Sequence, residues 1–386
     1  MKKGEKIIRI VLTGGGTGGH IYPGIAVADE IKAIVKERNI AVDIYWIGSS
    51  RGMDYSIIEK CLERTGGSIK QFYGIPCGKL RRYFSLQNIT DLFRIIGGFF
   101  KAVQLLKKIN PDVVFSKGGF VSVPPCKAAK LLCIPYYTHE CDFTPGLATR
   151  LNSKNAKNIL ISYEDTKKYF SESLQKKCIV TGNPIRPAFY VDSAVEGRKF
   201  LDLSTKEHKP VLLVLGGSSG ARQINNLVVE NLQWLKERFI VVHQTGKAFA
   251  EENPAVMKSG DSSYKPYDFI YKEMVSVIQA SDIVLSRAGA NSLWECAVCK
   301  KPLVLIPLCG SGTRGDQVDN ALYFEKRNAA LVLAGEKANS ENLQKSLEML
   351  LDENKRKELS LNCEKILPKE KPAYIIAKTI LDGVDK

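Results

Sequence analysis

The sequence has no long uninterrupted apolar run and no paired cysteine motif of the kind that binds zinc. Its first apolar stretch, residues 7–12, follows a basic start and is cut short by glycines, so neither a signal peptide nor a membrane-spanning helix is predicted. The 10 cysteines are scattered, which is typical of reduced thiols that pack as small apolar side chains. Cys296 and Cys299 form a lone CxxC inside a helical pattern, and we expect no redox role for them. A cytosolic protein is expected.

The sequence also lacks a recognisable nucleic-acid-binding motif, although the chain is strongly basic. Lys and Arg total 56 against 41 acidic residues, a formal net charge of +15, and this excess favours anionic partners. The basic residues are dispersed, and there is no zinc finger or RNP1 sequence, so we expect no nucleic-acid partner. Nucleotides and an anionic membrane surface remain as candidate partners.

A length of 386 residues suggests two domains with a cleft between them. Short, unalternated apolar runs bounded by turn residues alternate with helical patterns, which is typical of parallel strands buried on both faces. The predicted strands are residues 6–13, 42–47, 112–116, 134–138, 211–215, 240–243, 283–286 and 303–307. We therefore predict an α/β fold with two doubly wound parallel sheets.

A stretch rich in proline and charge between residues 182 and 209 indicates a linker. The predicted domains are residues 1–185 and 186–366, and a final helix in residues 367–386 is expected to pack back on the first domain.

Glycine-rich turns follow three of the predicted strands, at residues 14–19, 216–221 and 286–289. A strand that turns sharply into a helix leaves several backbone N–H groups unpaired, and glycine lets an anion approach them closely. We therefore interpret the turns as phosphate-binding loops. The alternative is that the glycines only permit tight turns, which explains one such loop better than three.

Gly14, Gly16 and Gly19 match the GxGxxG pattern of dinucleotide-binding enzymes, with Pro23 near the expected helix start. Those enzymes place an acidic residue at the end of the second strand to bind a ribose. Here the second strand ends in the neutral run 46–50, and Asp43 lies at its start. An NAD-dependent oxidoreductase therefore remains only a remote alternative.

The third glycine turn is followed by Glu295, which is expected early in a helix. A carboxylate there can accept two hydrogen bonds from a ribose diol. The alternative is that the acid only stabilises the positive end of the helix.

The motifs GGGTGGHIYP (14–23), HE (139–140), GNPIR (182–186), GGSSGAR (216–222) and SRAG (286–289), together with Glu295, DQ (316–317) and NA (320–321), resemble the MurG family in order and spacing. That family consists of peptidoglycan N-acetylglucosaminyltransferases. The resemblance implies a GT-B fold of two Rossmann-like domains and an inverting hexosyltransferase. It implies UDP-N-acetylglucosamine as donor and undecaprenyl-diphosphate-linked N-acetylmuramyl-pentapeptide (lipid I) as acceptor, giving lipid II. A role in cell-wall biogenesis, cell shape and cell division would follow.

The resemblance also implies which residues bind the donor. From the first domain and the linker these are Thr17, Gly18, Gly19, Asp142 and Arg186. From the second domain they are Ser218 near the diphosphate, Ile270 against the uracil, Gln317 on the sugar, and the helical run Ala290, Asn291, Ser292, Leu293, Trp294 and Glu295 along the ribose and diphosphate.

One position and one short stretch differ from the best-known form of this family. Asp142 stands where that form has asparagine, so it keeps an acceptor and loses the amide donor. The stretch RGDQ, ending at Gln317, replaces a more basic one.

Inverting transfer needs a base that takes the proton from the attacking hydroxyl. His20 is the first candidate, because it follows the glycine turn directly and histidine titrates near neutrality. Glu140 is the second, as part of an acidic pair with Asp142 that could instead hold a cation. The chain contains no Asp-x-Asp motif, and the glycine loop at 216–222 can neutralise the leaving diphosphate. We therefore predict chemistry without a metal or other cofactor.

A basic, aromatic segment at residues 78–84 precedes a stretch rich in Leu, Ile and Phe, which ends in lysines near residue 108. This pattern is typical of a helix that lies on an anionic bilayer, and it predicts a peripheral protein on the cytoplasmic face of the inner membrane. The alternative is an ordinary core helix. Within the same fold, a UDP-N-acetylglucosamine 2-epimerase or another GT-B transferase is the closest rival function, and a lipid-facing helix favours the lipid-acceptor transferase.

Overall fold

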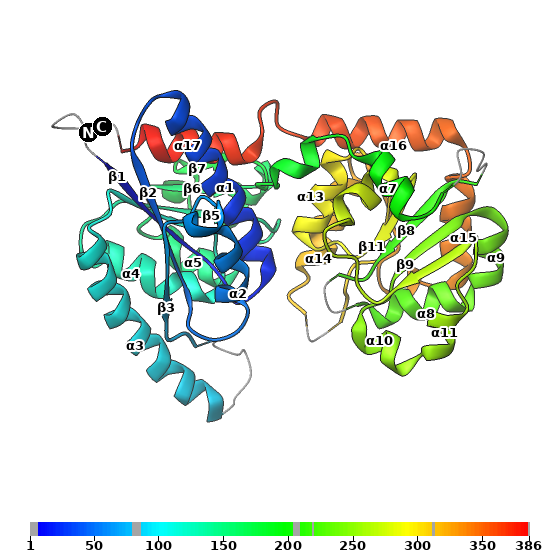
Figure 1. The fold of residues 1–386 in the computed structure, drawn as a ribbon, viewed down its shortest axis with the longest axis horizontal. Coiled ribbons are helices and arrows are strands. Elements are labelled where there is room, and N and C mark those ends of the chain that lie inside the picture. Colours follow the sequence, from blue (N-terminus) through cyan, green and yellow to red (C-terminus); the bar gives the residue numbers. More distant parts are fainter. Residues whose placement is uncertain (1–6, 79–85, 204–208, 218–219, 311–312, 385–386) are drawn as a thin grey trace. The chain divides into compact units, whose positions relative to one another are not determined.

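The computed structural model describes residues 7–78, 86–203, 209–217, 220–310 and 313–384. The chain divides into two compact units, each with its own parallel sheet (Figure 1). Unit 1 comprises Met1–Arg186 and Pro368–Lys386, and unit 2 comprises Pro187–Leu367. All strand pairs of the described residues within the two sheets are parallel, which confirms the predicted doubly wound α/β fold.

Unit 1 is built on a sheet whose described strands run in the order β3-β2-β1-β4-β5-β6-β7. These strands are β1 (Ile8–Thr13), β2 (Val42–Ser49), β3 (Gln71–Ile75), β4 (Val113–Ser116), β5 (Tyr136–Glu140), β6 (Asn158–Ile161) and β7 (Cys178–Val180). Its α-helices are α1 (Gly18–Glu37), α2 (Asp54–Ile58), α3 (Leu86–Ile109), α4 (Val123–Leu131), α5 (Leu147–Ser153), α6 (Glu172–Gln175) and α17 (Pro372–Asp382).

Both faces of the unit 1 sheet are covered. Ile10 and Leu12 of β1 lie in one hydrophobic core with residues of α1 and α17, while Val11 lies in a second core with residues of α3 and α4. Adjacent residues of one strand thus point into opposite cores, and both must be apolar. This explains why the central strands appear in the sequence as continuous apolar runs.

Unit 2 contains a sheet whose described strands run in the order β10-β9-β8-β11-β12-β13. These are β8 (Val211–Leu215), β9 (Ile240–Gln244), β10 (Tyr264–Tyr267), β11 (Ile283–Ser286), β12 (Leu303–Leu305) and β13 (Ala330–Val332). The helices are α7 (Ala194–Phe200), α8 (Arg222–Glu230), α9 (Leu232–Arg238), α10 (Lys247–Glu252), α11 (Pro254–Lys258), α12 (Met274–Ala280), α13 (Ala290–Val298), α14 (Asp316–Glu325), α15 (Ser340–Met349) and α16 (Glu353–Ile366).

The strand order reverses once in each sheet, between β1 and β4 in unit 1 and between β8 and β11 in unit 2. The connections that leave the two strands at such a switch point diverge to opposite faces of the sheet. The crevice that they leave at the carboxyl ends of the strands is where open α/β sheets bind ligands. The three glycine turns follow β1, β8 and β11, so each lies at one of these switch points.

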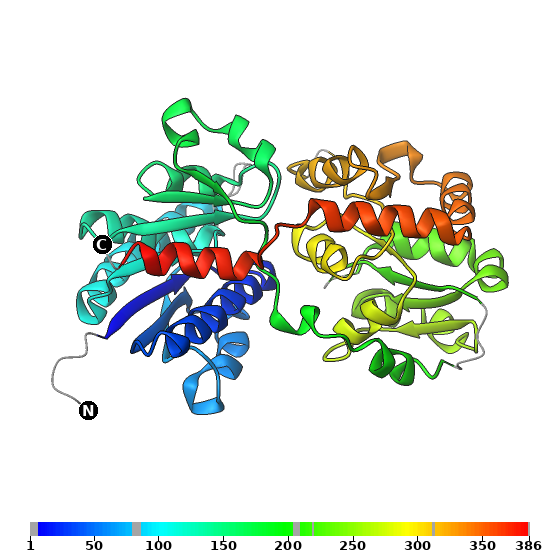
Figure 2. The same cartoon turned by 90° about the horizontal axis from the view of Figure 1, so that it is seen from above.

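The last helix, α17, returns to unit 1 and packs beside α1 (Figures 1 and 2). Ile376, Ile380 and Leu381 are fully or almost fully buried in the core that also contains the apolar residues of α1. The Lys157 Nζ donates to the carbonyl oxygen of Gly383 at 3.1 Å, which anchors the end of the helix beside β6.

The eight strands predicted from the sequence correspond to β1, β2, β4 and β5 in unit 1 and to β8, β9, β11 and β12 in unit 2. The prediction missed β3, β6, β7, β10 and β13. The missed strands lie toward the sheet edges. β7 is exposed or half-buried throughout, and β10 contains Pro266, a residue that parallel sheets tolerate at an edge. Pro23 was also misplaced: α1 begins at Gly18, so Pro23 lies inside the helix and not at its start.

Candidate functional site

The carboxyl ends of β8 and β11 border a pocket in unit 2. It is lined by Leu215, Gly216, Gly217, Ser286, Arg287, Gly289, Ser292 and Gln317. The pocket therefore brings together the two glycine turns of unit 2 with Ser292 and Gln317, two of the residues that the sequence predicted for donor binding. Its position at the switch point is the one expected for a ligand site.

Glycine is required at the turn after β8. Gly217 has a φ of +83°, and a Cβ at Gly216 would collide with the backbone nitrogen of Ala221. The chain can therefore turn tightly before α8 begins at Arg222, and its backbone stays open to an anion. Ser218, which the sequence predicted near the diphosphate, lies outside the described residues.

The second turn of the pocket leads into α13, which begins at Ala290 after the N-cap Gly289. Leu293 and Trp294 are buried and anchor the helix in unit 2, whereas Asn291, Ser292 and Glu295 are half-buried. Glu295 lies in the second turn and the first turn holds no acidic residue, so its expected position early in the helix was wrong. Because the helix dipole acts mainly within the first turn, stabilisation of the helix end explains Glu295 poorly.

Arg287 also lines the pocket. It belongs to the SRAG motif, but the sequence analysis assigned it no role. Its partial burial lowers the pKa of the guanidinium from the usual value. A cation that lines a pocket together with two glycine turns is suited to a diphosphate. The sequence signal was a basic residue inside a glycine turn, and it became interpretable only once that turn was placed opposite the turn after β8.

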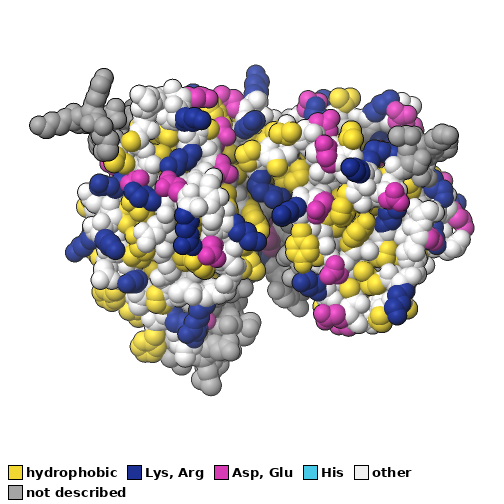
Figure 3. Space-filling model, in the orientation of Figure 1, with side chains coloured by type: hydrophobic (Ala, Val, Ile, Leu, Met, Phe, Trp, Pro, Cys, Tyr) yellow, Lys and Arg dark blue, Asp and Glu magenta, His cyan; other side chains and the backbone are white. Residues whose placement is uncertain are grey.

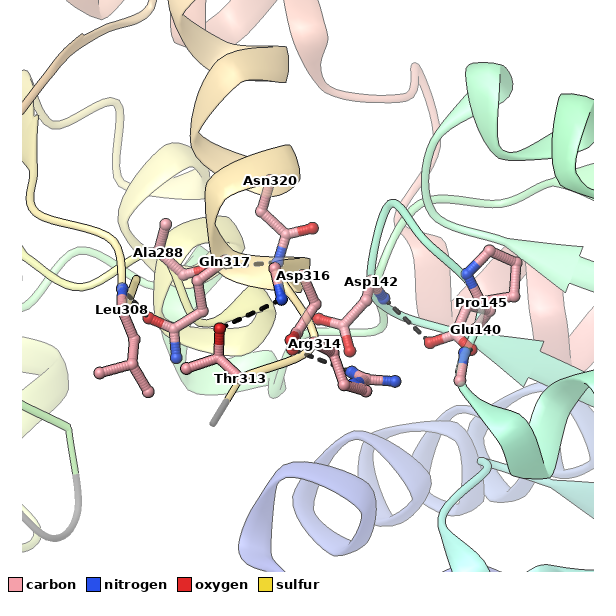
Figure 4. A network of polar contacts seen from close by, with 12 residues as sticks. Glu140, Asp142, Pro145, Ala288, Leu308, Thr313, Arg314, Asp316, Gln317 and Asn320 are labelled. Atoms are coloured by element: carbon pink, nitrogen blue, oxygen red, sulfur yellow. Dashed lines mark hydrogen bonds and ion pairs between the residues drawn. The ribbon is translucent and has the colours of Figure 1, made fainter. Parts of the chain in front are cut away.

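Helix α14 supplies the remaining polar wall of the pocket (Figure 4). The Gln317 Oε1 accepts a hydrogen bond from the backbone N–H of Leu308 at 3.0 Å, and the Asn320 Nδ2 donates to the carbonyl oxygen of Ala288 at 3.1 Å. These bonds fix the helix to the loops after β11 and β12. The Gln317 carboxamide is thereby held at the pocket in one orientation.

Ile270 is not among the residues that line this pocket. Its side chain is buried, and its backbone N–H donates to the Gln244 Oε1 at 2.9 Å. The segment after β10 is thus tied to the end of β9 in the same unit.

In unit 1, the glycine turn after β1 is held by Asp54, a residue that the sequence analysis missed. The Asp54 carboxylate accepts hydrogen bonds from the backbone N–H of Gly16 at 2.9 Å and of Ser49 at 2.8 Å. Burial raises the pKa of Asp54, although the two backbone bonds oppose this shift. The carboxylate thus holds the turn through its backbone N–H groups. No sequence motif indicated this role of Asp54.

His20 lies in the first turn of α1, and Gly18 and Gly19 open the helix after the N-cap Thr17. The Thr17 Oγ1 lies 2.9 Å from the His20 Nδ1. When Nδ1 carries the hydrogen and donates it to Thr17, the Nε2 atom carries the lone pair that a general base needs. Thr17 therefore fixes the orientation of the ring, and the contact is compatible with the tautomer that a base needs.

Glu140 ends β5 with a buried carboxylate whose two oxygens accept backbone hydrogen bonds (Figure 4). The donors are the N–H of Asp142 at 3.1 Å and of Gly146 at 2.9 Å. Glu140, Cys141 and Asp142 bring their ligand atoms within 4.8 Å of one another, so these three residues could hold a cation. The Glu140 oxygens, however, already order the loop after β5 through these two hydrogen bonds.

Arg186 is the last residue of the first segment of unit 1, and it lies next to α1. Its guanidinium lies over the ring of Tyr22, 5.5 Å from the centroid. Tyr22 follows His20 by two residues, so Arg186 is held near the glycine turn by a cation–π contact.

The lone CxxC forms no reactive dithiol. Cys296 is buried in α13, and burial raises its pKa well above the usual value; burial also raises the pKa of Cys299 to about 11. Thiols with raised pKa values are poor nucleophiles at neutral pH.

Helix α3 exposes a group of large apolar side chains between residues 92 and 100, which we call the α3 patch: Leu92, Phe93, Ile96 and Phe100, with exposed fractions of 50, 69, 46 and 66%. The segment after the patch packs Ala102, Leu105, Leu106 and Ile109 into the core. The helix thus has an exposed apolar segment followed by a segment that packs in the core. Hydrophobic and basic side chains lie beside one another over α3, at the lower left of Figure 3. Of the basic, aromatic segment at 78–84, all but Gly78 lies outside the described residues.

Among the described helices, none combines the length and the apolar character needed to cross a bilayer.

Each unit matches a known protein family. The glycosyltransferase family 28 N-terminal domain matches residues 10–161, and the family 28 C-terminal domain matches residues 211–380. A protein of Treponema denticola named UDP-N-acetylglucosamine–N-acetylmuramyl-(pentapeptide) pyrophosphoryl-undecaprenol N-acetylglucosamine transferase is 47% identical over 381 residues, covering 95% of this chain and 96% of its own. A Clostridium botulinum protein of the same name is 38% identical over 344 residues, covering 89% and 91%.

Solved structures show the same fold at low identity. MurG of Acinetobacter baumannii superposes with a TM-score of 0.71 at 20% identity, covering 97% of this chain and 99% of its own. A UDP-GlcNAc 2-epimerase from Neisseria meningitidis bound to UDP-GlcNAc gives a TM-score of 0.66 at 17% identity, covering 98% and 100%.

Proposed function

Because the chain belongs to the MurG family of glycosyltransferases, we propose that it transfers N-acetylglucosamine from UDP-N-acetylglucosamine to undecaprenyl-diphosphate-linked N-acetylmuramyl-pentapeptide, converting lipid I into lipid II in peptidoglycan synthesis. The 47% identity to the Treponema denticola protein over nearly the whole of both chains carries this proposal. The pocket of unit 2 supports it independently, since it offers glycine turns and a cation at a switch point.

The donor binds in unit 2 under this proposal. Its diphosphate lies against the turn at Gly216 and Gly217, where the backbone, the N-terminus of α8 and the Arg287 guanidinium oppose the negative charge. Glu295 accepts hydrogen bonds from the ribose, and Gln317 contacts the sugar. From the same family pattern, the donor site also includes Ser218, Ile270, Ala290, Asn291, Ser292, Leu293 and Trp294 in unit 2, and Thr17, Gly18, Gly19, Asp142 and Arg186 in unit 1.

His20 is the base in the proposed reaction. Its Nε2 takes the proton of the acceptor hydroxyl while the hydroxyl oxygen bonds to C1 of the donor sugar. The bond from C1 to the diphosphate oxygen breaks on the opposite face, and UDP leaves with the electron pair. The contact from Thr17 supports this role, because it fixes the ring. Glu140 is the weaker candidate, because backbone N–H groups already occupy both its oxygens.

We expect the reaction to proceed without a metal ion or other cofactor, since the glycine turn and Arg287 can oppose the charge of the leaving diphosphate. Glu140, Cys141 and Asp142 are the described residues that would hold an ion if one were needed. Turnover should survive EDTA. Loss of activity in EDTA with recovery on adding Mg²⁺ would contradict this part of the proposal.

The lipid acceptor requires contact with a bilayer, and the α3 patch supplies a surface for it. Exposed Phe93 and Phe100 can enter the interface, while Lys101 of the same helix favours anionic headgroups. We therefore propose a peripheral enzyme on the cytoplasmic face of the inner membrane.

An assay with labelled UDP-N-acetylglucosamine and a lipid-diphosphate muramyl pentapeptide tests the function. The proposal predicts a labelled lipid-linked disaccharide that depends on the acceptor. Conversion of the donor to its 2-epimer without any acceptor would instead favour the epimerase, which shares the fold. A shift of the melting temperature by NADH and not by UDP would favour the oxidoreductase.

A further inference from the structure

Lys117 is one of the largest fully buried side chains of the described chain, with 1% of its surface exposed. Its Nζ has no hydrogen-bond partner among the described residues. A buried ammonium is costly unless an anion or an acceptor compensates it. The position is therefore explained poorly by packing alone.

Lys117 directly follows β4, so it lies at the switch point of the unit 1 sheet, across from the glycine turn that follows β1. The two segments are in contact. A Cβ built on Gly14 would lie 3.2 Å from the Lys117 Cβ and 3.3 Å from the carbonyl oxygen of His20. Gly118 and Gly119 follow with φ angles of +93° and +77° and turn the chain away at once. Lys117 thus packs against the base of the turn that opens α1.

The charge of Lys117 acts on His139, a second buried group that has a nitrogen without a hydrogen-bond partner among the described residues. His139 of β5 is fully buried, and its Nδ1 has no hydrogen-bond partner among the described residues. Burial, then the charge of Lys117, lowers the pKa of His139 well below the usual value, so His139 is neutral near pH 7. The carboxylates of Asp54 and Glu140 in the same unit accept backbone N–H groups of the loops. With no hydrogen-bond partner among the described residues, the Lys117 ammonium is available to an anionic ligand.

The proposed reaction involves two diphosphates, one on the donor and one on the lipid acceptor. The pocket of unit 2 provides glycine turns and Arg287 for one of them. Unit 1 has an equivalent arrangement, with a glycine turn, the N-terminus of the 20-residue helix α1 and a buried cation at the switch point.

We propose that Lys117 is an acceptor-binding residue whose ammonium pairs with a phosphate oxygen of the lipid-linked diphosphate. This inference rests on the proposed function and assigns one further residue to it. The pairing places the acceptor next to the turn that carries His20. It also gives a role to a buried lysine that has no hydrogen-bond partner among the described residues.

Lys117→Met tests the assignment, because methionine has a similar length and no charge. We expect the KM for the lipid acceptor to rise roughly tenfold to a hundredfold, as for the loss of a charge-assisted hydrogen bond. The KM for UDP-N-acetylglucosamine and the calorimetric Kd for UDP should stay within about threefold. The melting temperature should not fall, because the substitution removes an uncompensated buried charge.

Lys130→Met is the matched control, since Lys130 is exposed on α4, and it should leave both KM values unchanged. Lys117→Arg, which keeps the charge, should recover part of the acceptor affinity. An unchanged acceptor KM in Lys117→Met would overturn the proposal, as would weaker binding of UDP with normal acceptor binding. If the wild-type protein forms no disaccharide at all, the proposed function itself fails, and the two failures are thereby distinguished.

Discussion

Individual residues at the ends of central strands carry most of the proposed chemistry. Thr17 and His20 form a local pair, in which the hydroxyl fixes the ring of the proposed base. Arg287 and Lys117 place one cation at the switch point of each sheet. Their roles depend on where the strands end.

Replacement of His20 by Asn removes the proposed base. We expect kcat to fall roughly a hundredfold to ten-thousandfold, while the KM for UDP-N-acetylglucosamine changes little. Thr17→Val, which leaves the histidine and removes its orienting contact, should lower kcat less. Initial rates with saturating acceptor measure both effects, and a normal kcat in the Asn variant would rule out His20 as the base.

Arg287→Met should weaken the binding of UDP and lower kcat/KM by roughly a hundredfold or more, because a cation is lost beside the departing diphosphate. Calorimetry with UDP and steady-state rates measure the two effects. Lys300→Met is the control, since Lys300 forms an exposed ion pair with Glu364 elsewhere in unit 2. Equal UDP affinity in the two variants would argue against the proposed role of Arg287.

His243 makes the stability of unit 2 depend on pH. Burial lowers its pKa to about 3, and its ring nitrogens lie 3.0 Å from the Tyr264 hydroxyl oxygen and 3.1 Å from the Asn225 Oδ1. The unfolded chain binds a proton near pH 6.5 and the folded chain does not. The free energy of unfolding should therefore fall by about 1.4 kcal/mol per pH unit from about pH 6.5 toward pH 3.

Urea unfolding of unit 2 followed by circular dichroism between pH 7 and pH 4 measures this slope. His243→Gln should show a shallower slope whatever its absolute stability. The same slope in both proteins would mean that His243 is not the group responsible.

At the scale of elements, helix α3 combines an exposed apolar segment with a segment that packs in the core. Phe93→Ser together with Phe100→Ser should reduce sedimentation with anionic vesicles several-fold or more, because about 1.5–3 kcal/mol is lost per large apolar side chain that no longer enters the bilayer. Turnover of a water-soluble acceptor analogue should be unchanged. Leu131→Ser on α4 is the control, as that side chain is 62% exposed outside the patch. Equal vesicle binding in all three proteins would contradict the membrane role of α3.

The strands show how far the sequence could predict the elements. β8 and β11 were predicted to the residue, because a central parallel strand buries both faces and is apolar throughout. The edge strands β3 and β7 are partly exposed, and β10 contains Pro266, so their composition resembles that of loops. Sequence reasoning therefore located the switch points and missed the sheet edges.

At the scale of the molecule, each unit repeats one device, a glycine turn and a buried or half-buried cation at a switch point. The glycine turns are visible in the sequence because they follow strong strands. Arg287, Asp54 and Lys117 were not, because their roles depend on contacts between segments far apart in the chain. Asp54, for example, holds Gly16 from a position 38 residues away.

The configuration of the glycosidic bond in the product shows whether the chain transfers a sugar to a lipid acceptor with inversion. NMR of the product made from UDP-N-acetylglucosamine labelled with ¹³C at C1, together with the lipid-linked muramyl pentapeptide, observes the new bond itself. We predict a single β-linked disaccharide, formed in amounts equal to the UDP released and only when the acceptor is present. An α-linked product, or UDP release without any disaccharide, would contradict this mechanism.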